Sequence, residues 1–398
     1  MSARSELTIG RRIELLRRRR GLSRQAFAGL VGYSAEWLRQ VEKGDRGLDK
    51  LTTLLRIAEV LRIDDVSSFI GIVVPPQRTR PGDSTAPSAV RQALFHPAPL
   101  ESVTMDVDVL CDRLEATWTG WQGATHRYSL MQRCLPPLLG QVSRLAADDS
   151  PLGQRVTAQT YRLTAAYLRH VNDPPLALLA SERALSAARR CGDDVVLAAC
   201  EGGMASTLVS LGCEGDAADV CRRAAARLSP GVPTDPPEVV SVWGATQLIA
   251  AEIEAVRNDH LAAWASLDLA GKAAEVLGHD RNDLHSSFGP TDVGIHAVRV
   301  EIVLGRIRRA LRLASKVDVS GTVTSERQAL HYIALARAHA EERDAAAAAF
   351  ALLQAEEACA EEIVFNGEAH RVVHTLLDLD DAAVRSQVWR LAERAKLL

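Results

Sequence analysis

The sequence predicts an all-α protein with a small N-terminal domain and a larger helical body. Its apolar content is 47% with 4% aromatic residues, a balance typical of helices that pack through alanine, leucine and valine. Apolar residues recur at helical spacing from about residue 105 to the end of the chain. A length of 398 residues also exceeds what one core usually serves. We therefore expect an N-terminal domain at 1–72 (the head), a linker at 73–100 and a helical body at 101–398.

The segment from Leu22 to Gly44 is predicted to form two short helices joined by a tight turn. Ser23 and Ser34 can each cap the start of a helix through the side-chain oxygen. Gly32 can adopt the left-handed conformation that ends the first helix. Because so short a pair cannot bury its apolar faces alone, the flanking segments are expected to complete the core through Ile13, Leu16, Leu51, Leu54, Leu55, Ala58 and Leu61.

In these residues the segment resembles the Xre/Cro family of lambda-repressor-like, helix-turn-helix DNA-binding domains. The resemblance covers roughly residues 7–70 and implies a five-helix domain whose last short helix spans 64–69. The matching positions are Leu22, Ser23, Phe27, Ala28, Gly32, Ser34, Leu38, Val41, Glu42, Gly44, Leu54, Ile57, Ala58 and Leu61.

The same resemblance implies that the second helix of the motif lies in the major groove of DNA. By position, Ala35, Glu36 and Gln40 would read bases, and Arg24 would contact a phosphate. The alternative for Glu36 is that its carboxylate only repels phosphate. The full set of expected DNA contacts is Arg24, Ser34, Ala35, Glu36, Arg39, Gln40, Lys43 and Arg46.

Two further residues of the motif have expected structural roles. Glu42 matches a family carboxylate that pairs with a basic residue on the first helix of the domain, for which Arg17 is the candidate. Trp37 is large for its position and could pack on a sugar edge, on a neighbouring helix or against a partner.

The distribution of charge indicates which domain binds a polyanion, and the cysteines indicate the compartment of the protein. Residues 1–80 contain 16 lysines and arginines against 9 acidic residues, whereas the whole chain has a net charge of −3. A basic head on an acidic body suggests that only the head meets DNA. The 7 cysteines include no C-x-x-C pair, which is typical of reduced thiols in a cytoplasmic protein. Apolar runs are shorter than the roughly 18 residues that a membrane helix needs, so no membrane partner is expected.

Between head and body, residues 73–100 contain six prolines and no apolar period. This composition predicts an extended, mobile linker that lets the head reorient.

The body is predicted to repeat a helix, turn, helix unit. The turn can be aligned as an apolar residue followed six positions later by alanine, and its irregular spacing indicates a degenerate, tetratricopeptide-like solenoid of helical hairpins. The instances are Val171 to Ala177, Leu211 to Ala217, Val256 to Ala262, Leu304 to Ala310 and Ala340 to Ala346.

The block Phe288 to His296 carries a second resemblance. Together with the head and the proline-interrupted helix from Tyr128 to Leu145, it looks like a large family of actinobacterial Xre-type regulators with a tetratricopeptide-like C-terminal region. That resemblance implies transcriptional control and leaves the sensed ligand open.

Candidate ligand-binding residues follow from the expectation that a solenoid binds on its concave face. Trp243 and Gln247 share one helix face, and Asp292, His296 and Arg299 share another. The alternative is that Trp243 belongs to the core and the second group forms an outer ion-paired stripe.

Catalytic and metal chemistry have little support in the sequence. His370 and His374 stand at i, i+4 but lack the glutamate that a zinc hydrolase places after the first histidine, so no metal site is expected. No nucleophile elbow, phosphate loop or dinucleotide fingerprint is present, so we expect neither an enzyme nor a cofactor.

These observations lead to a sequence-specific DNA-binding transcriptional regulator whose body senses a small molecule, peptide or protein partner. The alternative is a protein-protein adaptor with a vestigial or tethering helix-turn-helix. One head reads few base pairs, so a homodimer on two half-sites is expected. The apolar seam of the last helix, 381–398, could be covered by the body or by a partner helix.

Overall fold

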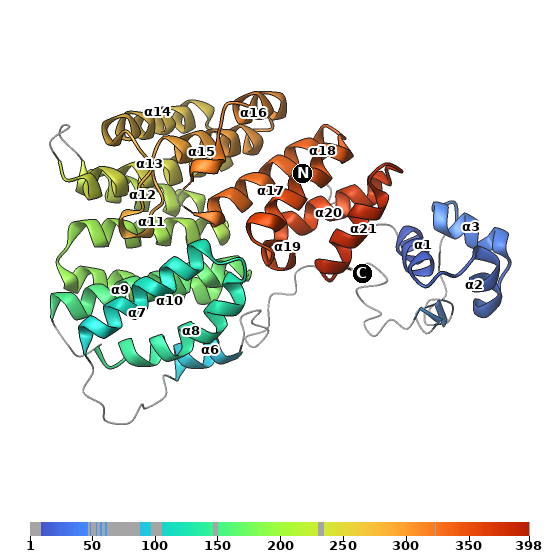
Figure 1. The fold of residues 1–398 in the computed structure, drawn as a ribbon, viewed down its shortest axis with the longest axis horizontal. Coiled ribbons are helices and arrows are strands. Elements are labelled where there is room, and N and C mark those ends of the chain that lie inside the picture. The colour runs from blue at the N-terminus through green and yellow to red at the C-terminus, as the bar shows by residue number, and fades with distance from the viewer. Residues whose placement is uncertain are drawn as a thin grey trace.

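The computed structural model of the chain describes residues 9–46, 88–96, 106–145, 150–229, 235–322 and 324–397, together with residues 48, 53, 56, 57, 60 and 61. The regular elements in these ranges are helices, apart from one isolated bridge between Arg281 and Phe288. The predicted all-α class is confirmed (Figure 1).

The head begins with α1 (Ile9–Arg19), α2 (Arg24–Val31) and α3 (Ala35–Lys43). Both predicted caps form, since the Ser23 hydroxyl accepts from Ala26 N and the Ser34 hydroxyl accepts from Trp37 N, each at 3.1 Å. Gly32 ends α2 with φ +87°, which confirms the predicted left-handed turn. The predicted helix at 64–69 and the domain boundary at 72 lie outside the described residues.

The core of the head joins all three of these helices. Phe27, Leu38 and Val41 from the helix-turn-helix pack with Ile13 of α1 and with Ile57. Helices α1 and α3 approach so closely at Gly10 that a Cβ atom there would lie 1.9 Å from the Val41 carbonyl oxygen. A glycine is therefore required at this crossing.

The predicted linker is described only at 88–96, and there it is not extended. Residues Ser88–Phe95 form α6, whose Val90 and Leu94 are buried in the same core cluster as helix α8 (Arg127–Val142). Arg183 also donates to the Leu94 carbonyl at 2.7 Å. Two apolar residues at helical spacing were enough to make this stretch part of the body, against the expectation from its prolines.

The body consists of helical hairpins that stack side by side. After α7 (Val107–Gly123) and α8, which carries two internal prolines, consecutive helices pair in the order predicted. The pairs are α9 (Pro151–His170) with α10 (Pro174–Cys191), α11 (Asp194–Ser210) with α12 (Glu214–Leu228), α13 (Pro237–Val256) with α14 (His260–Leu277), α15 (Pro290–Val303) with α16 (Ile307–Ala314), and α17 (Ser325–Glu341) with α18 (Ala345–Ala358).

Each hairpin turn uses the same short backbone path. One turn residue adopts positive φ, and the fifth residue after it is a fully buried alanine where the second helix meets the first. The predicted register is right for Ala177, Ala217 and Ala310 and wrong for Ala262 and Ala346, because the buried residues there are Ala263 and Ala348. The left-handed residues are Asn172, Gly212, Asn258, Gly305 and Arg343.

The two ends of this array meet. Glu361, just before α19 (Glu362–Phe365), accepts from the backbone N–H groups of Tyr128 and Ser129 at 2.7 and 3.1 Å. The buried Arg127 guanidinium pairs with Glu326 at 2.9 Å and with Glu362 at 2.5 Å. The body is therefore closed from its first helices back to α17 and α19.

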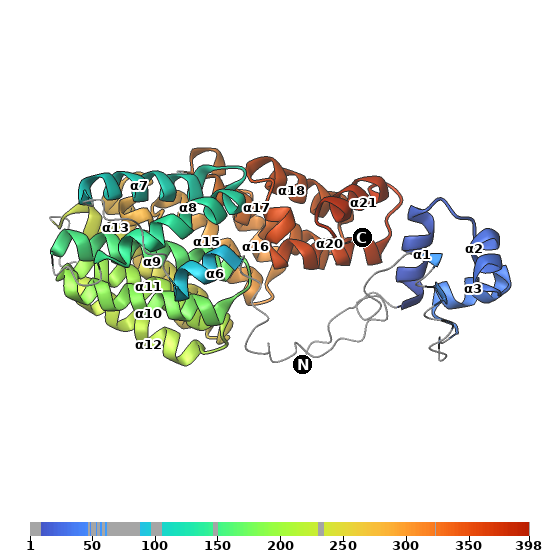
Figure 2. The same ribbon diagram turned by 90° about the horizontal axis from the view of Figure 1, so that it is seen from below.

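The chain ends in α20 (Gly367–Leu379) and α21 (Arg385–Arg394). Val388, Leu391 and Ala395 of the predicted seam are buried in one core cluster of the body. The apolar seam of the last helix is thus covered by the body, which was the first of the two predicted alternatives, and not by a partner helix. Leu15 of α1 belongs to the same cluster, and α1 is the head helix that faces α20 and α21 (Figure 2).

Helix α13 is long and apolar enough to cross a membrane by length and composition alone. In the body, however, 56% of its apolar window is buried against neighbouring helices.

Candidate DNA-binding surface and ligand cavity

The polar face of α3 carries three of the predicted DNA-contacting residues in contact with one another. The Arg39 guanidinium donates to both carboxylate oxygens of Glu36, at 2.8 and 2.6 Å. The Gln40 amide donates to Glu36 at 3.4 Å. These hydrogen bonds, Arg39 above all, lower the pKa of the exposed Glu36 carboxyl.

The remaining predicted contacts lie around this face. The Ser34 hydroxyl is occupied by its helix cap. Lys43 and Arg46 are exposed at the end of α3 and just after it, and Ala35 is half-buried in the first turn. Their exposed positions leave Lys43 and Arg46 accessible to a polyanion.

Arg24 is more constrained than the sequence suggested. Its guanidinium pairs with Glu42 at 2.5 Å and with Glu14 at 3.5 Å. The predicted pair between Arg17 and Glu42 is confirmed at 2.6 Å. Glu42 therefore holds α1, α2 and α3 together through two arginines, and Arg24 keeps a side chain that is 41% exposed.

The packing of Trp37 is now specified. Its ring stacks on Tyr33 with centroids 3.9 Å apart, and it belongs to the core of the head. The Tyr33 hydroxyl in turn hydrogen-bonds with the Thr53 hydroxyl at 3.0 Å. Of the three roles considered, this residue packs within its own domain.

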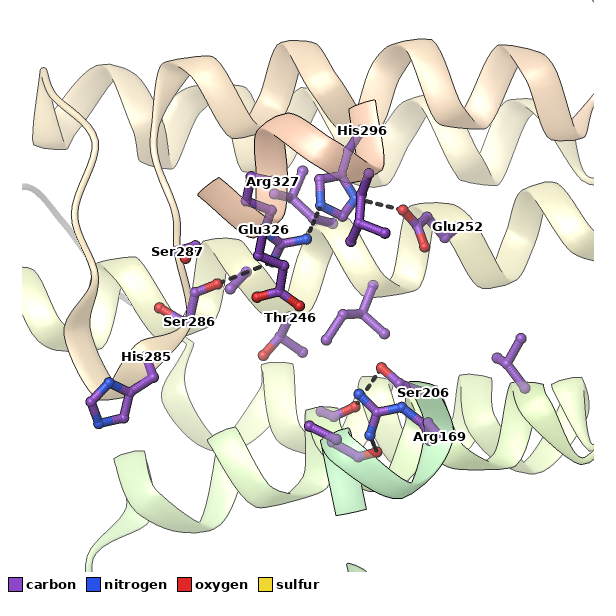
Figure 3. Close-up of a pocket in the computed structure, with 18 of the residues that line it drawn as sticks. Arg169, Ser206, Thr246, Glu252, His285, Ser286, Ser287, His296, Glu326 and Arg327 are labelled. Atoms are coloured by element: carbon purple, nitrogen blue, oxygen red, sulfur yellow. Dashed lines mark hydrogen bonds and ion pairs between the residues drawn. The ribbon is translucent and has the colours of Figure 1, made fainter. Parts of the chain in front are cut away.

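A cavity of about 530 Å³ lies inside the body. Its walls come from α7, α9, α11, α13, α15 and α17, which are the inner helices of the successive hairpins. Figure 3 shows the opposed walls, with Arg169 and Ser206 facing Glu326, His296 and Arg327 across the space.

One wall of the cavity is an ion-paired network. Glu252 pairs with His296 Nδ1 at 2.8 Å and with Arg299 at 3.1 Å. Burial opposes ionisation of Glu252, yet Arg299 and His296 lower its pKa to about 2. Glu326 is held by Arg127 in the same way, with its pKa also lowered to about 2 against the effect of burial.

Asp292 lies behind this wall and does not line the cavity. Its side chain is 1% exposed and pairs with Arg327 at 3.4 Å. Burial raises the pKa of this carboxyl to about 7. The predicted group is thus divided, because His296 and Arg299 reach the cavity and Asp292 supports Arg327 from outside it.

The opposite wall carries two arginines of α9 that the sequence did not single out. Arg162 stacks over Trp118 at 4.6 Å and donates to the Leu284 carbonyl. Arg169 makes long hydrogen bonds of 3.4 Å to the Gly203 carbonyl and the Thr207 hydroxyl. Burial lowers the pKa of both guanidinium groups to about 10.

A strained loop, residues 279–289, closes one end of the cavity. Leu284, His285 and Ser287 have φ values of +44°, +54° and +48°. Each such residue costs on the order of 1–3 kcal/mol, so the fold must hold the loop in place. Phe288 does so by packing fully buried against Gly244, where a Cβ atom would lie 2.0 Å from its ring, and His285 stacks on Trp118 at 4.6 Å.

The other predicted candidates have structural roles. Trp243 packs against a core cluster of the body, as its alternative role predicts, and neither it nor Gln247 is among the residues that line the cavity. Helix α13 is apolar around much of its circumference, and its inner face is formed instead by Val242, Thr246 and Ile249. His370 Nε2 is bonded to the Ile363 and Val364 carbonyls at 3.0 and 3.1 Å.

The sequence contains a weak signal for the cavity wall formed by α9, which the sequence-based predictions did not include. Arg162 and Arg169 are seven positions apart, which places them on one face of a helix. Gly202 and Gly203 interrupt the middle of α11, where glycine costs helix stability and so indicates a close approach or a space.

Comparisons with known proteins identify the head. Residues 8–67 match a family model described as a helix-turn-helix domain. No match was found among curated proteins.

The chain is also similar to a solved structure, that of Bacillus thuringiensis PlcR in complex with the peptide PapR7 and DNA. The identity is 15% and the TM-score is 0.35, over 78% of this chain and 94% of PlcR.

Proposed function

We propose that the protein is a cytoplasmic, sequence-specific DNA-binding transcription regulator of the Xre type, whose tetratricopeptide-like body binds an effector in its central cavity. The observation that carries the DNA-binding part is the helix-turn-helix at Arg24–Lys43, whose second helix has a solvent-accessible polar face. Glu36, Arg39 and Gln40 are there bonded to one another, so DNA can displace these bonds without disturbing the core.

The effector-binding part rests on the cavity. Its volume of about 530 Å³ is in the range of small-molecule sites, and Arg127 of α8 holds one of its lining residues, Glu326 of α17. The carboxylates of Glu252 and Glu326 are each occupied by an arginine, which favours binding over acid–base catalysis.

The contact between head and body offers a route from cavity to DNA. Helix α17 lines the cavity through Glu326 and Arg327, and α17 packs on α20, which ends at the contact with α1. An effector that favours one arrangement of these helices would change operator affinity, and a tenfold change needs about 1.4 kcal/mol of preference.

The DNA-binding proposal is tested with purified full-length protein and a selection from random duplexes. Gel-shift titrations then compare Gln40→Ala on the selected and a scrambled duplex. We expect a loss of about 1–3 kcal/mol on the selected duplex and little change on the scrambled one. Gln354→Ala, in α18 of the body, is the matched control.

Equal losses on both duplexes for Gln40→Ala would contradict the assignment of α3. A selection without sequence preference would instead favour the adaptor function. We infer that two copies bind the operator, which light scattering of the protein–DNA complex measures. Because the seam of α21 is buried within the chain, a dimer must use another surface.

A further inference from the structure

We propose that the effector is a small organic anion whose carboxylate or phosphate group is bound by Arg162 and Arg169. The inference deepens the proposed function and rests on it, because it names the class of molecule that the central cavity takes.

The first argument is the charge balance of the cavity. On the wall formed by α13, α15 and α17, acidic and basic groups are matched, with Arg299 on Glu252 and Arg327 on Asp292. Glu326 is matched by Arg127. The arginines of this wall therefore each have a carboxylate partner already.

The α9 wall is different. Among the described residues, neither Arg162 nor Arg169 has a carboxylate within ion-pairing distance. Two half-buried guanidinium groups without an ion-pair partner are costly, and they also repel each other. An anion between them would remove both penalties, and the low-dielectric surroundings would strengthen its binding.

The histidines beside the α9 wall do not change its net positive charge. Burial lowers the pKa of His170 to about 4 and that of His285 to about 3, so both rings are neutral at pH 7. The positive charge of the α9 wall is thus carried by arginine alone, which keeps its charge at any physiological pH.

The arginines are also held in place for binding. The Arg162 guanidinium is fixed by two contacts: it stacks on the Trp118 ring, and it donates a hydrogen bond to the Leu284 carbonyl of the strained loop. Arg169 is bonded only at 3.4 Å, so most of its N–H groups remain available. On the neighbouring helix α11, Gly202 and Gly203 have no side chain and Ser206 has a small one, which leaves space beside the arginines.

The rest of the cavity suits the organic part of such a ligand. Apolar side chains line α11 and α13 beside the arginines, so an apolar group can be buried while the acidic group is bound. These residues are Ala198, Ala199, Val242, Leu248, Ile249 and Ile253.

Three small probes of similar shape test whether binding depends on negative charge. They are phenyl phosphate, phenylacetate and the uncharged phenylacetamide. Binding to the full-length protein is measured by isothermal titration calorimetry at constant ionic strength, without DNA. We expect at least one anionic probe to bind with a Kd of about 1 mM or tighter, and phenylacetamide to bind at least about tenfold more weakly. If only phenyl phosphate binds, the acidic group of the effector is a phosphate; if only phenylacetate binds, it is a carboxylate.

The variants are Arg162→Gln and Arg169→Gln, with Arg223→Gln on the exposed face of α12 as the matched control. Each cavity variant should weaken the anionic probe at least about tenfold, and the control should not. Without ligand, each cavity variant should melt at or above the temperature of the wild type, because it removes an uncompensated buried charge.

The proposal fails if phenylacetamide binds as tightly as the anions, if the arginine variants bind them as the wild type does, or if no probe binds. Because the measurement contains no DNA, these results are independent of whether α3 reads an operator.

Discussion

Arg11, on the first helix of the head, forms an ion pair of 2.5 Å with Asp380, the residue that ends α20 of the body. Asp380 also accepts from Arg385 at 2.7 Å, and Leu15 inserts into the adjoining core of the body one turn along α1. Because α2 and α3 lie on the far side of the head, this contact leaves the proposed DNA-binding face open (Figure 2). It also ties the orientation of that face to the body.

We predict that Arg11→Ala loosens the head from the body. The pair is partly exposed, so its loss should cost on the order of 1 kcal/mol and should raise amide hydrogen exchange in both α1 and α21. Arg39→Ala, in α3 and paired with Glu36 of the same helix, is the control and should leave α21 unchanged. An α21 that exchanges equally in Arg11→Ala and wild type would show that the contact contributes nothing in solution.

Gly10 is predicted to be essential for the head. Gly10→Ala places a methyl group within 1.9 Å of the Val41 carbonyl oxygen, so α1 and α3 must separate. We expect a destabilisation of about 1–3 kcal/mol or more by thermal unfolding, with loss of DNA binding. Gly29→Ala in α2 meets no atom within 4 Å and should be neutral or slightly stabilising. Similar melting of both variants would mean that α1 packs elsewhere.

The loop at 279–289 should depend on Gly244. In Gly244→Ala the new methyl group overlaps the Phe288 ring, so the ring must leave its site and release the strained loop. We expect faster hydrogen exchange at 279–289 and weaker binding of the anionic probe, since Leu284 no longer positions Arg162. Gly271→Ala in α14 has open space around it and is the control. A loop that exchanges as slowly in Gly244→Ala as in wild type contradicts this anchoring role.

Acid sensitivity should arise in part from His331 of α17, which is 2% exposed. Burial, with a contribution from Arg299, lowers its pKa from 6.5 to about 4. Below pH 6.5 the unfolded chain takes up a proton that the folded chain does not, so stability falls as the pH drops from 6.5 towards 4. The full effect of this residue, reached near pH 4, is about 3 kcal/mol, of which about 2 kcal/mol falls between pH 7 and pH 5. His331→Leu should flatten the curve by that order.

Chemical denaturation at pH 7 and pH 5 measures this slope. His279→Gln, at an exposed position after α14, should retain the slope of the wild type. A His331→Leu protein that loses as much stability on acidification as the wild type would place the acid sensitivity elsewhere.

Local signals in the sequence were reliable where a backbone conformation decided the outcome. Ser23, Gly32 and Ser34 delimit the helix-turn-helix as predicted, and the turns near Asn172 and Gly305 mark their hairpins. The register failed at Ala262 because a run of alanines leaves the buried position undetermined by one residue.

The cavity was only partly predictable because its walls are distant in sequence. His296 was found from its spacing to Arg299, but the importance of Arg169 depends on which carboxylates lie near it after folding. Trp243 could not be assigned to core or cavity from the sequence, because an apolar helix does not reveal which of its faces turns inward. Helix α6 was missed because prolines on both sides concealed its two apolar residues.

The contact of Glu361 with the backbone of Tyr128 spans 233 residues of sequence and changes how the body can unfold. An open array of hairpins loses its terminal repeats one at a time, because each repeat contacts only its neighbours. Here the first and last repeats protect each other through the buried Arg127, Glu326 and Glu362, so neither can fray alone. The body should therefore unfold as a single cooperative unit and fold slowly, since so long a loop must close before its contacts form.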